Sequence, residues 1–384
     1  MSDAAGPNPP HPVPRILHLH STFAAGGKEV RAARLMNAWG PRLDHTIVSA
    51  EPQAMAAAAL IAGHVPVRYP DDFPALKGRP TPARLARLAQ AMRGFDLVCT
   101  YNWGAMDAVM AHRIHANTLR LPPLVHHEDG FNEDEAERLN PGRNLFRRAA
   151  LGRAAALIVP STGLERIARD VWRQPEARVR RIANGIDTAA FAAPADPAAL
   201  PIRKGEGELW VGTLAGLRKV KRLPDLVAAF ASLPANWHLV ICGEGPERAA
   251  IQTEAEALGL TARVHLPGNV DPARVAGLFD IFALSSASEQ FPLSVVEAMA
   301  AGVPVAATDV GDIRAILPPE NAAFLTPPND PHSLGESLIT LAADPALRAR
   351  LGAANRERAR AHFDFAVMQA AYEAAYIRAM GRAF

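Results

Sequence analysis

The sequence predicts an α/β protein built from two doubly wound domains that face a central cleft. Short apolar runs alternate with longer Ala-, Leu- and Arg-rich helical stretches along the chain, the pattern of parallel sheets covered by helices on both faces. The 384 residues exceed what one hydrophobic core usually organises. Between the halves lies a stretch rich in Ala, Pro and Gly in which no periodicity continues, as is typical of an inter-domain linker.

Short apolar runs mark the expected strands. In the first half they lie at Arg15–Leu19, His45–Ser49, Val65–Tyr69, Asp96–Thr100, Leu124–His127, Ala156–Pro160 and Val179–Ile182. In the second half they lie at Glu208–Thr213, His238–Cys242, Arg263–Leu266, Ile281–Leu284, Val303–Thr308 and Ala322–Leu325. Ligands of open parallel sheets bind beyond the carboxyl ends of the strands. The residues that directly follow these runs are therefore the candidates for function.

The same signals predict the domain boundaries. A disordered arm covers residues 1–14, and an N-terminal domain covers 15–190. The linker covers 191–207, where the run Ala-Ala-Pro-Ala-Asp-Pro lies. A C-terminal domain covers 208–364, and a final helix over 365–384 is expected to pack back on the N-terminal domain.

Charge and cysteine content exclude several classes of partner. The formal net charge is only +2, which argues against nucleic acid as a partner. Cys99 and Cys242 lie in apolar runs and resemble buried strand residues rather than disulfides or thiolate metal ligands. The first residues lack the basic-then-apolar order of a signal peptide, and no apolar run approaches roughly 18 residues. We therefore expect a cytoplasmic protein.

Basic residues are concentrated in one stretch of the first half. Between Arg138 and Arg181 there are eleven arginines and only three acidic residues. One interpretation is a set of solvated helix faces. The other is a surface that meets anionic lipid or a phosphorylated acceptor, which would place the protein peripherally at the inner face of a membrane.

The strongest candidate site follows the strand at Ile281–Leu284. A Ser- and Ala-rich loop leads to Glu289, and a helix is expected to begin near Pro292, because Pro suits the first turn of a helix. The backbone N–H groups of that first turn would bind an anion or a hydroxyl. Glu297 lies inside the apolar run that follows, so it is expected to be buried and to need a partner. The alternative is a helix cap at Glu289 and a solvated helix residue at Glu297.

The segment from Glu289 to Thr308 resembles the donor motif of glycosyltransferase family 4. Glu289 and Glu297 are eight residues apart, Phe-Pro follows the first, and Glu-Ala-Met-Ala-Ala-Gly-Val-Pro-Val-Ala-Ala-Thr begins at the second. The resemblance covers nearly the whole chain and is most specific in its second half. It implies the GT-B fold, with two Rossmann-like domains, and transfer with retention at the anomeric carbon.

The resemblance also implies roles for the residues of the motif. Glu289 would contact hydroxyls of the donor sugar, and Glu297 would contact the ribose of the nucleotide. Three residues at the start of the helix would complete the donor site, namely Phe291, Pro292 and Leu293. The family usually has Gly where this chain has Gln290, so the shape of the sugar pocket, and with it the sugar, is left open.

A cationic loop follows the strand at Glu208–Thr213. It reads Gly212-Thr-Leu-Ala-Gly216-Leu-Arg218-Lys-Val-Lys221, and fixed cations at a cleft can neutralise a diphosphate leaving group. The alternative is a solvated basic turn. In family 4 the corresponding loop carries an Arg and, five residues later, a Lys. Lys221 matches the Lys, whereas Gly216 stands at the Arg position, and we expect Arg218 to replace that side chain.

Glycine-rich turns follow two other strands. Gly26 and Gly27 come after the first strand, where small residues let backbone N–H groups approach an oxygen-rich ligand. The alternative is an ordinary strand-to-helix turn. The spacing is neither that of a P-loop nor that of the dinucleotide fingerprint. The family has a similar turn near the donor phosphates. Gly243, after the strand at His238–Cys242, would approach the nucleotide.

Histidines and carboxylates cluster at the end of the strand at Leu124–His127. By resemblance His126 matches a family histidine near the donor sugar, while His127, Glu128 and Asp129 are candidates for the acceptor side. A metal site is not expected, because adjacent strand residues point to opposite faces. The following acidic run, 133–135, lies in a helical pattern and is interpreted as a solvated face.

These features together predict a hexosyltransferase that needs no cofactor and no metal. A UDP- or GDP-linked sugar would dock on the C-terminal domain, where Lys221 and Arg218 stabilise the departing diphosphate. Domain closure would then bring His126 and the Gly26–Gly27 turn onto the sugar. The acceptor hydroxyl, on a lipid-linked or envelope glycoconjugate, would attack from the leaving-group face. Two alternatives are a nucleotide-sugar epimerase on the same fold and a nucleotide-sugar-binding subunit without activity.

Overall fold

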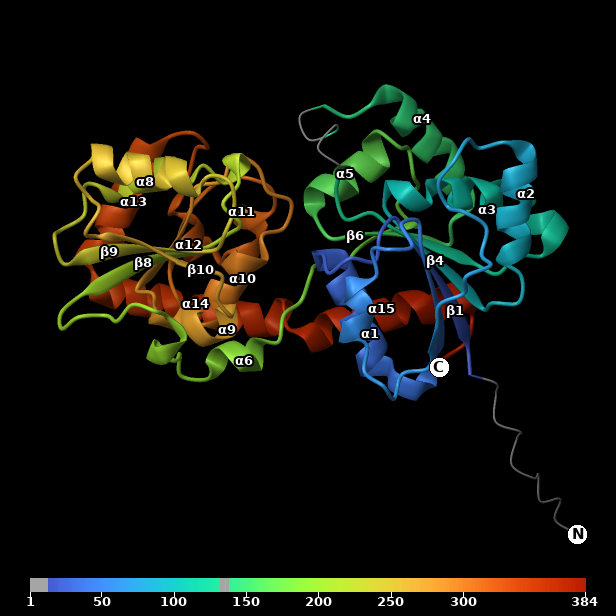
Figure 1. Cartoon of the computed structure of the whole chain (residues 1–384), viewed down its shortest axis with the longest axis horizontal. Coiled ribbons are helices and arrows are strands. Elements are labelled where there is room, and N and C mark those ends of the chain that lie inside the picture. Colours follow the sequence, from blue (N-terminus) through green and yellow to red (C-terminus); the bar gives the residue numbers. More distant parts are fainter. Residues whose placement is uncertain (1–12, 132–134, 136–137) are drawn as a thin grey trace, which may run out of the picture. The chain divides into compact units, whose positions relative to one another are not determined.

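A computed structural model describes residues 13–131, 135 and 138–384 of the chain. The described residues form two compact units (Figure 1). Unit 1 comprises the chain up to Pro160, Leu164–Ile182 and Gln369–Phe384, and unit 2 comprises Ser161–Gly163 and Ala183–Met368. The predicted arm, residues 1–14, lies outside the described residues except for its last two positions.

Unit 1 contains a seven-stranded sheet in the order β3-β2-β1-β4-β5-β6-β7, with all its pairings parallel. The strands are β1 (Arg15–His20), β2 (Asp44–Ser49), β3 (Val67–Arg68), β4 (Leu97–Tyr101), β5 (Leu124–His127), β6 (Ala156–Val159) and β7 (Val179–Arg181). The α-helices are α1 (Gly27–Trp39), α2 (Pro82–Ala91), α3 (Met106–Leu119), α4 (Pro141–Ala150) and α5 (Thr162–Asp170). The short 3-10 turns are η1 (Gly40–Arg42), η2 (Ala56–Leu60), η3 (Trp103–Ala105) and η5 (Leu151–Arg153).

Unit 2 contains a six-stranded parallel sheet in the order β10-β9-β8-β11-β12-β13. Its strands are β8 (Leu209–Leu214), β9 (Trp237–Cys242), β10 (Val264–Gly268), β11 (Ile281–Leu284), β12 (Val305–Thr308) and β13 (Leu325–Thr326). Its helices are α6 (Thr188–Ala192), α7 (Leu223–Phe230), α8 (Arg248–Ala257), α9 (Pro272–Val275), α10 (Leu293–Ala300), α11 (Ile313–Ile316), α12 (Pro319–Ala322), α13 (Pro331–Ala343) and α14 (Pro345–His362). The 3-10 turns are η6 (Pro197–Ala199), η7 (Lys219–Lys221) and η8 (Ala276–Leu278).

Strand residues alternate between the two faces of each sheet, and both faces are buried. In β11, Phe282 and Leu284 join one core with residues of α10, whereas Ile281 and Ala283 join another with residues of α7 and α13. Because both faces of each sheet are buried, successive residues of a strand are all apolar, instead of alternating between apolar and polar. The predicted doubly wound α/β class is confirmed for both units.

Several boundaries differ from the expectation, and the chain already belongs to unit 2 from Ala183 on, before the predicted end of the first domain at residue 190. The predicted linker, residues 191–207, belongs to unit 2, because Phe191 and Leu200 are buried in its core. The expected strand at Ala322–Leu325 is confined to Leu325–Thr326, because Pro319, in the first turn of α12, starts a helix that runs to Ala322.

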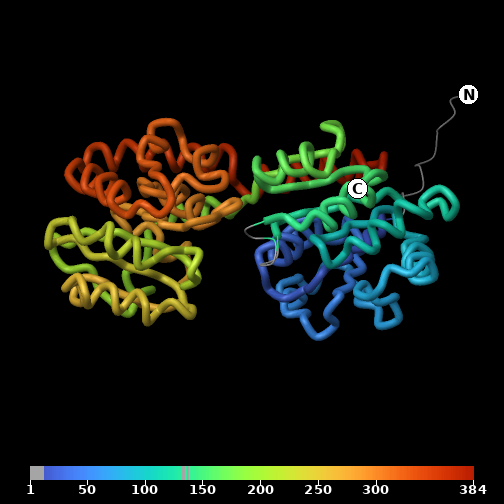
Figure 2. The backbone as a smooth tube through the Cα atoms, turned by 90° about the horizontal axis from the view of Figure 1, so that it is seen from above, coloured from blue at the N-terminus to red at the C-terminus, as the bar shows by residue number. Residues whose placement is uncertain are grey.

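The last helix, α15 (Phe365–Met380), belongs to both units. Its first four residues lie in unit 2, and the remainder, from Gln369 on, lies in unit 1 (Figure 2, red end of the tube). Tyr372 and Tyr376 are buried in unit 1, where both rings contact the ring of His127. Among the described residues, no helix is both long and apolar enough to span a bilayer.

Strand order reverses once in each sheet, between β1 and β4 in unit 1 and between β8 and β11 in unit 2. At such a switch point the loops that leave neighbouring strands diverge and leave room for a ligand at the carboxyl edge of the sheet. The segments between β1, β8 or β11 and the α-helix that follows carry six of the predicted site residues, Gly26, Arg218, Lys221, Glu289, Phe291 and Pro292.

Candidate functional site

In unit 2 the loops that follow β8 and β11 are joined by hydrogen bonds. The backbone N–H of Ala287 donates to the carbonyl of Val220 at 2.8 Å, and the Ser285 hydroxyl donates to the carbonyl of Lys221 at 2.9 Å. These contacts hold the cationic turn η7 against the loop that carries Glu289. The two strongest motifs of the sequence therefore form one site, although 68 residues separate Lys221 from Glu289.

Glu289 and Lys221 form an ion pair at the centre of this site. Nζ of Lys221 lies 2.5 Å from Oε1 of Glu289, and the Ser286 hydroxyl donates to the same oxygen at 2.7 Å. Both charged side chains are largely buried, at 14% and 12% exposure. The Ser286 contact was not predicted, because nothing in the Ser-rich loop distinguishes one of its serines from the others.

Arg218, the predicted replacement for the family arginine, lies beside Gly216. A Cβ atom added at Gly216 would lie 3.7 Å from Nε of Arg218. The Arg218 side chain therefore occupies the space beside position 216. Its exposed guanidinium belongs to the same turn as Lys221, and Lys219 and Arg222 lie on this loop as well.

Glu297 projects from α10, and its carboxyl group is mostly buried. Burial, assisted by the nearby charge of Asp271, raises the pKa of Glu297 to about 7. No hydrogen bond or ion pair to this carboxylate appears among the residues that the structure describes. Glu297 as a whole is partly exposed, and its contact with a ribose stays a prediction.

The other predicted donor residues have varied surroundings. Phe291 packs against Phe363, and Pro292 is the N-cap residue of α10, one position before Leu293. Gly243 has a φ of 142°, and a Cβ there would overlap the carbonyl of Ala215, so this glycine permits the loops after β8 and β9 to meet.

Gly212 has a packing role that the sequence did not reveal. It lies within β8, two residues before the strand ends, and is buried. A Cβ there would overlap the ring of Phe279. The missing side chain is thus explained by the packing of the core, and the prediction that Gly212 contacts the donor stays a prediction.

In unit 1 the adjacent histidines His126 and His127 point to opposite faces of the sheet. Nδ1 of His126 lies 2.8 Å from the Thr100 hydroxyl, whereas Nε2 of His127 lies 3.1 Å from the Tyr376 hydroxyl on α15. Nδ1 of His127 is also engaged, by the Thr100 carbonyl. Because both ring nitrogens of His127 have protein partners, its place among the acceptor contacts is better explained as anchorage of the last helix.

A cluster of buried aromatic and imidazole rings lies on the α15 face of the sheet. Nε2 of His18 is 3.0 Å from Nδ1 of His45, and Nδ1 of His18 is 3.0 Å from the Tyr101 hydroxyl. The His20 ring stacks on Tyr101 with 3.9 Å between centroids. Burial lowers the pKa of His45 to about 4 and of His127 to about 3, and lowers the pKa values of His18 and His20 well below their usual value. These four histidines are therefore neutral at pH 7.

Asp129 is held by Arg31 of α1, and the glycine turn lies at the start of the same helix. Both oxygens of Asp129 accept from Arg31, at 2.5 and 2.9 Å, and this pair lowers the pKa of Asp129 against the effect of burial. Gly26 is the N-cap of α1, where a Cβ would lie 2.8 Å from the carboxylate of Glu29. The space around Gly27 is open.

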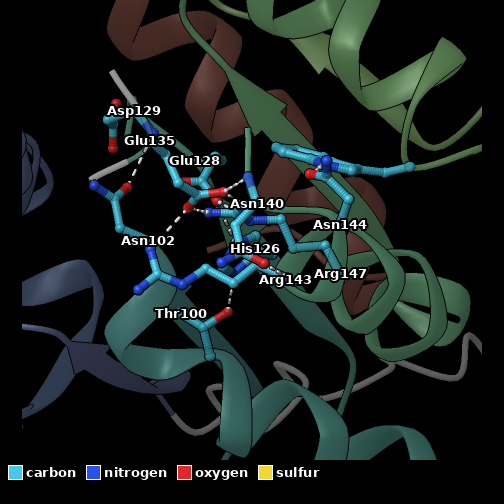
Figure 3. Close-up of polar contacts among 11 residues, drawn as sticks. Thr100, Asn102, His126, Glu128, Asp129, Glu135, Asn140, Arg143, Asn144 and Arg147 are labelled. Atoms are coloured by element: carbon cyan, nitrogen blue, oxygen red, sulfur yellow. Dashed lines mark hydrogen bonds and ion pairs between the residues drawn. The ribbon is translucent and has the colours of Figure 1, made fainter. Parts of the chain in front are cut away.

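Glu128 belongs to a second charged group, which lies at the end of β5 and along α4 (Figure 3). Its carboxylate lies 3.4 Å from Nε of Arg147 and 3.8 Å from Nε2 of His126. Arg147 also donates two hydrogen bonds to Glu135. The acidic run at 133–135 was expected to be a solvated face. Its first two positions lie outside the described residues, and at Glu135 the expectation is wrong, because that side chain is buried against Arg147.

Two models of known protein families together match most of the chain. Residues 25–190 match the model described as Glycosyltransferase Family 4, and residues 201–358 match the model described as Glycosyl transferases group 1. The chain is 31% identical over 166 residues to N-acetyl-alpha-D-glucosaminyl L-malate synthase of Bacillus anthracis, a match that covers 42% of this chain and 44% of that protein. It is also 31% identical to D-inositol 3-phosphate glycosyltransferase of Xylanimonas cellulosilytica, over 69% of this chain and 68% of that one.

The chain belongs to glycosyltransferase family 4. Its fold is that of solved GT-B proteins, as shown by Anabaena Alr3699/HepE in complex with UDP, which superposes with a TM-score of 0.74. That match has 21% sequence identity and covers 93% of this chain and 97% of the other. The chain nevertheless spans only about half the length of the curated relatives it matches. The match covers 44% of the malate synthase and 50% of a phosphatidyl-myo-inositol mannosyltransferase of Mycobacterium leprae.

Proposed function

We propose that this family 4 chain is a retaining glycosyltransferase of hexosyltransferase type that works without a metal ion. It moves a sugar from a UDP- or GDP-linked donor to an acceptor hydroxyl. The observation that carries the proposal is the cluster of Lys221, Ser286 and Glu289, which places a cation, a hydroxyl and a carboxylate in contact at the carboxyl edge of a sheet. A relative of the same fold has been solved with UDP, which supports a nucleotide-linked donor.

Each group in unit 2 has a distinct chemical task in this proposal. Lys221 and Arg218 stabilise the negative charge that develops on the diphosphate as its bond to the anomeric carbon breaks. Glu289 accepts hydrogen bonds from sugar hydroxyls, and Glu297 accepts them from the ribose. The bond from the anomeric carbon to the acceptor oxygen forms on the face that the diphosphate leaves. The acceptor proton passes to a phosphate oxygen of the donor.

The acceptor is proposed to be a lipid-linked or envelope glycoconjugate, reached by a cytoplasmic protein at the inner face of a membrane. A relative named phosphatidyl-myo-inositol mannosyltransferase supports a lipid-linked acceptor. The Arg-rich stretch supports membrane contact less than its composition suggests. Arg147, Arg169 and Arg178 each donate hydrogen bonds to protein atoms in unit 1.

The test of the proposed function is a thermal-shift panel of UDP- and GDP-linked sugars on the wild-type chain and on Glu289→Ala. We expect one nucleotide sugar to raise Tm strongly in the wild type and much less in the variant. The free nucleoside diphosphate should stabilise both proteins, because it does not reach Glu289. A panel in which no nucleotide sugar raises Tm would refute the proposal. Release of nucleoside diphosphate only in the presence of an acceptor would separate transfer from epimerisation and from binding alone.

The replacement of the family arginine by Arg218 gives a rescue experiment. Arg218→Ala is expected to reduce kcat about tenfold to a hundredfold, because one of two cations that face the diphosphate is lost. Adding Gly216→Arg to that variant should restore much of the activity, since a Cβ at position 216 would lie only 3.7 Å from Nε of Arg218. Arg222→Ala, which removes a cation paired with Asp225 instead, is the matched control. If the second substitution does not restore activity, Arg218 does not act in place of position 216.

The raised pKa of Glu297 predicts that nucleotide binding depends on pH. Ribose hydroxyls donate more strongly to the ionised carboxylate than to the protonated acid, so binding should release a proton near the pKa of about 7. Affinity for the nucleoside diphosphate is expected to rise toward a tenfold gain per pH unit below pH 7 and to level off above it. Calorimetry in buffers of different ionisation enthalpy would count the released proton. Glu297→Gln should bind more weakly and lose this pH dependence; an unchanged pH profile in the variant would contradict the assignment.

A further inference from the structure

A cavity of about 620 Å³ lies at the amino edge of the sheet in unit 1, and we call it the amino-edge cavity. Arg15, the first residue of β1, lines it together with Thr46 of β2 and Arg68 of β3. The predicted site residues of unit 1 lie at the opposite, carboxyl edge. Because β1 has six residues that rise about 3.3 Å each, roughly 17 Å separate the two edges. The cavity is large enough for a small ligand, since such sites measure roughly 300 to 1,000 Å³.

Polar side chains form the floor of this cavity, on a sheet face that is otherwise apolar. Leu19 pairs with Val48, and both are buried in the core beneath α2. Two residues nearer the amino edge, Leu17 pairs with Thr46, which in turn pairs with Arg68. Thr46 is only 6% exposed, yet its hydroxyl makes no hydrogen bond within the described part of the chain. A buried hydroxyl usually has a partner, so this one points to a ligand in the cavity.

Two charged groups in the wall have no ion pair among the residues described, namely the Arg15 guanidinium and the Asp72 carboxylate. The guanidinium lies over the ring of Phe95 at 5.2 Å, and the backbone N–H of Arg15 donates to Asp96 at 2.8 Å. These contacts position the guanidinium without neutralising its charge. Asp72 lies on the segment that follows β3. The cavity therefore offers one donor group and one acceptor group that the protein itself does not use.

Aromatic rings and prolines form the rest of the wall. Phe73 and Phe95 are partly buried against the core of unit 1, and Tyr69 is 40% exposed, so the cavity is open to solvent. Pro70 and Pro74 lie on the same segment as Phe73, and their rings fix the backbone there. A wall that is fixed before binding loses little conformational entropy when a ligand binds.

The mixture of polar groups selects the class of ligand. A guanidinium only donates hydrogen bonds, a carboxylate only accepts them, and a hydroxyl does both. A ligand with several hydroxyls satisfies Arg15, Asp72 and Thr46 at once, and its apolar ring faces pack on the aromatic wall. A phosphate would meet the charge of Asp72, and Arg68 is already paired with Asp44. An amine would meet the charge of Arg15. A neutral saccharide fits all of these groups.

We propose that the amino-edge cavity is an accessory binding site for a neutral saccharide, separate from the place where a sugar is transferred. Arg15, Thr46 and Asp72 bind its hydroxyls, and the aromatic wall packs on its ring. The inference goes beyond the proposed function, because binding here requires neither a donor nor a transfer step. Such a site holds the protein on a glycan through a sugar unit other than the one that reacts, which raises the local concentration of that glycan.

The experiment measures sugar binding by saturation-transfer NMR on the full chain, without nucleotide. The probes are glucose, galactose and mannose, each compared with its own 6-phosphate. At least one neutral sugar should bind, and about tenfold or more tightly than its phosphate, because like charges placed together oppose binding.

Two substitutions in the cavity should weaken that binding. Thr46→Val removes the hydroxyl but keeps a strand-forming residue, and should raise Kd about threefold to tenfold. Asp72→Ala, at an exposed position, should raise Kd about tenfold or more, because a hydrogen bond to a charged group is lost. Asp71→Ala removes the neighbouring acid, which does not line this cavity, and Glu289→Ala alters the donor site. Both of these controls should leave Kd unaltered.

Three results would overturn the inference: no binding of any neutral sugar, tighter binding of the 6-phosphates, or an unaltered Kd in Asp72→Ala. The last result also decides the question if Thr46→Val fails to fold. Stabilisation of the same proteins by nucleotide sugars is measured in parallel, and Asp72→Ala should retain it. If nucleotide sugars bind but no free sugar does, this inference fails and the proposed function stands. If free sugars bind in the cavity but no nucleotide sugar binds, the proposed function fails instead.

Discussion

Replacement of Lys221 by Ala is expected to lower kcat by about 100-fold to 1,000-fold, the loss typical when one preorganised donor to a developing charge is removed. The reason is twofold. The diphosphate loses its best-buried cation, and Glu289 loses the partner that holds its carboxylate at 2.5 Å. Lys219 lies on the same turn, two residues earlier, and is exposed. Lys219→Ala is therefore the matched control for the loss of one positive charge.

A double-mutant cycle with Glu289→Gln extends this test. Steady-state kinetics on the two single variants and the double variant should give strongly non-additive effects, because the two side chains form one unit. Additive losses would show that Lys221 and Glu289 act on separate parts of the donor. Activity within threefold of the wild type in Lys221→Ala would remove this lysine from the mechanism.

Unit 1 is expected to lose stability steeply as the pH falls below about 6.5. Its buried histidines His18, His20, His45 and His127 have folded-state pKa values below that of an unfolded histidine. Below pH 6.5 the unfolded chain therefore binds more protons than the folded chain, so the free energy of unfolding falls with decreasing pH. It continues to fall until the folded-state values, about 4 for His45 and about 3 for His127, are passed.

Each histidine contributes a slope of at most about 1.4 kcal/mol per pH unit. Hydrogen exchange of a peptide over 369–380, measured between pH 5 and 7.5, reports this loss where α15 packs on the ring cluster. His45→Gln should flatten the slope by about one proton, whereas His332→Gln, at a surface position that is 85% exposed, should not. Equal slopes in the wild type and His45→Gln would show that the cluster is not the source of acid sensitivity.

The sequence predicted well wherever the cause is local. The apolar runs of β1, β4, β5 and β11 and the Pro at the start of α10 depend on neighbours within a few residues, and the structure has them close to the expected positions. The Glu289–Lys221 contact could also be anticipated, because the loops after β8 and β11 leave adjacent strands of one sheet. In a parallel sheet, a motif that directly follows a strand lies at the carboxyl edge of the sheet, where ligands bind.

Contacts between distant segments could not be predicted in this way. The pairing of Arg31 with Asp129 joins residues 98 positions apart, and neither motif requires the other. Gly212 resembled a ligand-binding glycine because the ring of Phe279, which fills its space, lies on another segment. Glu135 resembled a solvated acid because an acidic run shows its charge but not the two arginines of α4 that bury it.

The division of α15 between the two units has a consequence for biosynthesis. Tyr372 and Tyr376 complete the interior of unit 1, yet the ribosome adds them only after all of unit 2 has been made. Domains usually fold in the order of their synthesis. Here unit 1 emerges first, but its fold stays incomplete, with the ring of His127 uncovered, until α15 has been made. In a nascent chain that stalls inside unit 2, unit 1 would therefore expose apolar surface as well as the unfinished unit 2. Chaperones could then recognise the chain through either unit.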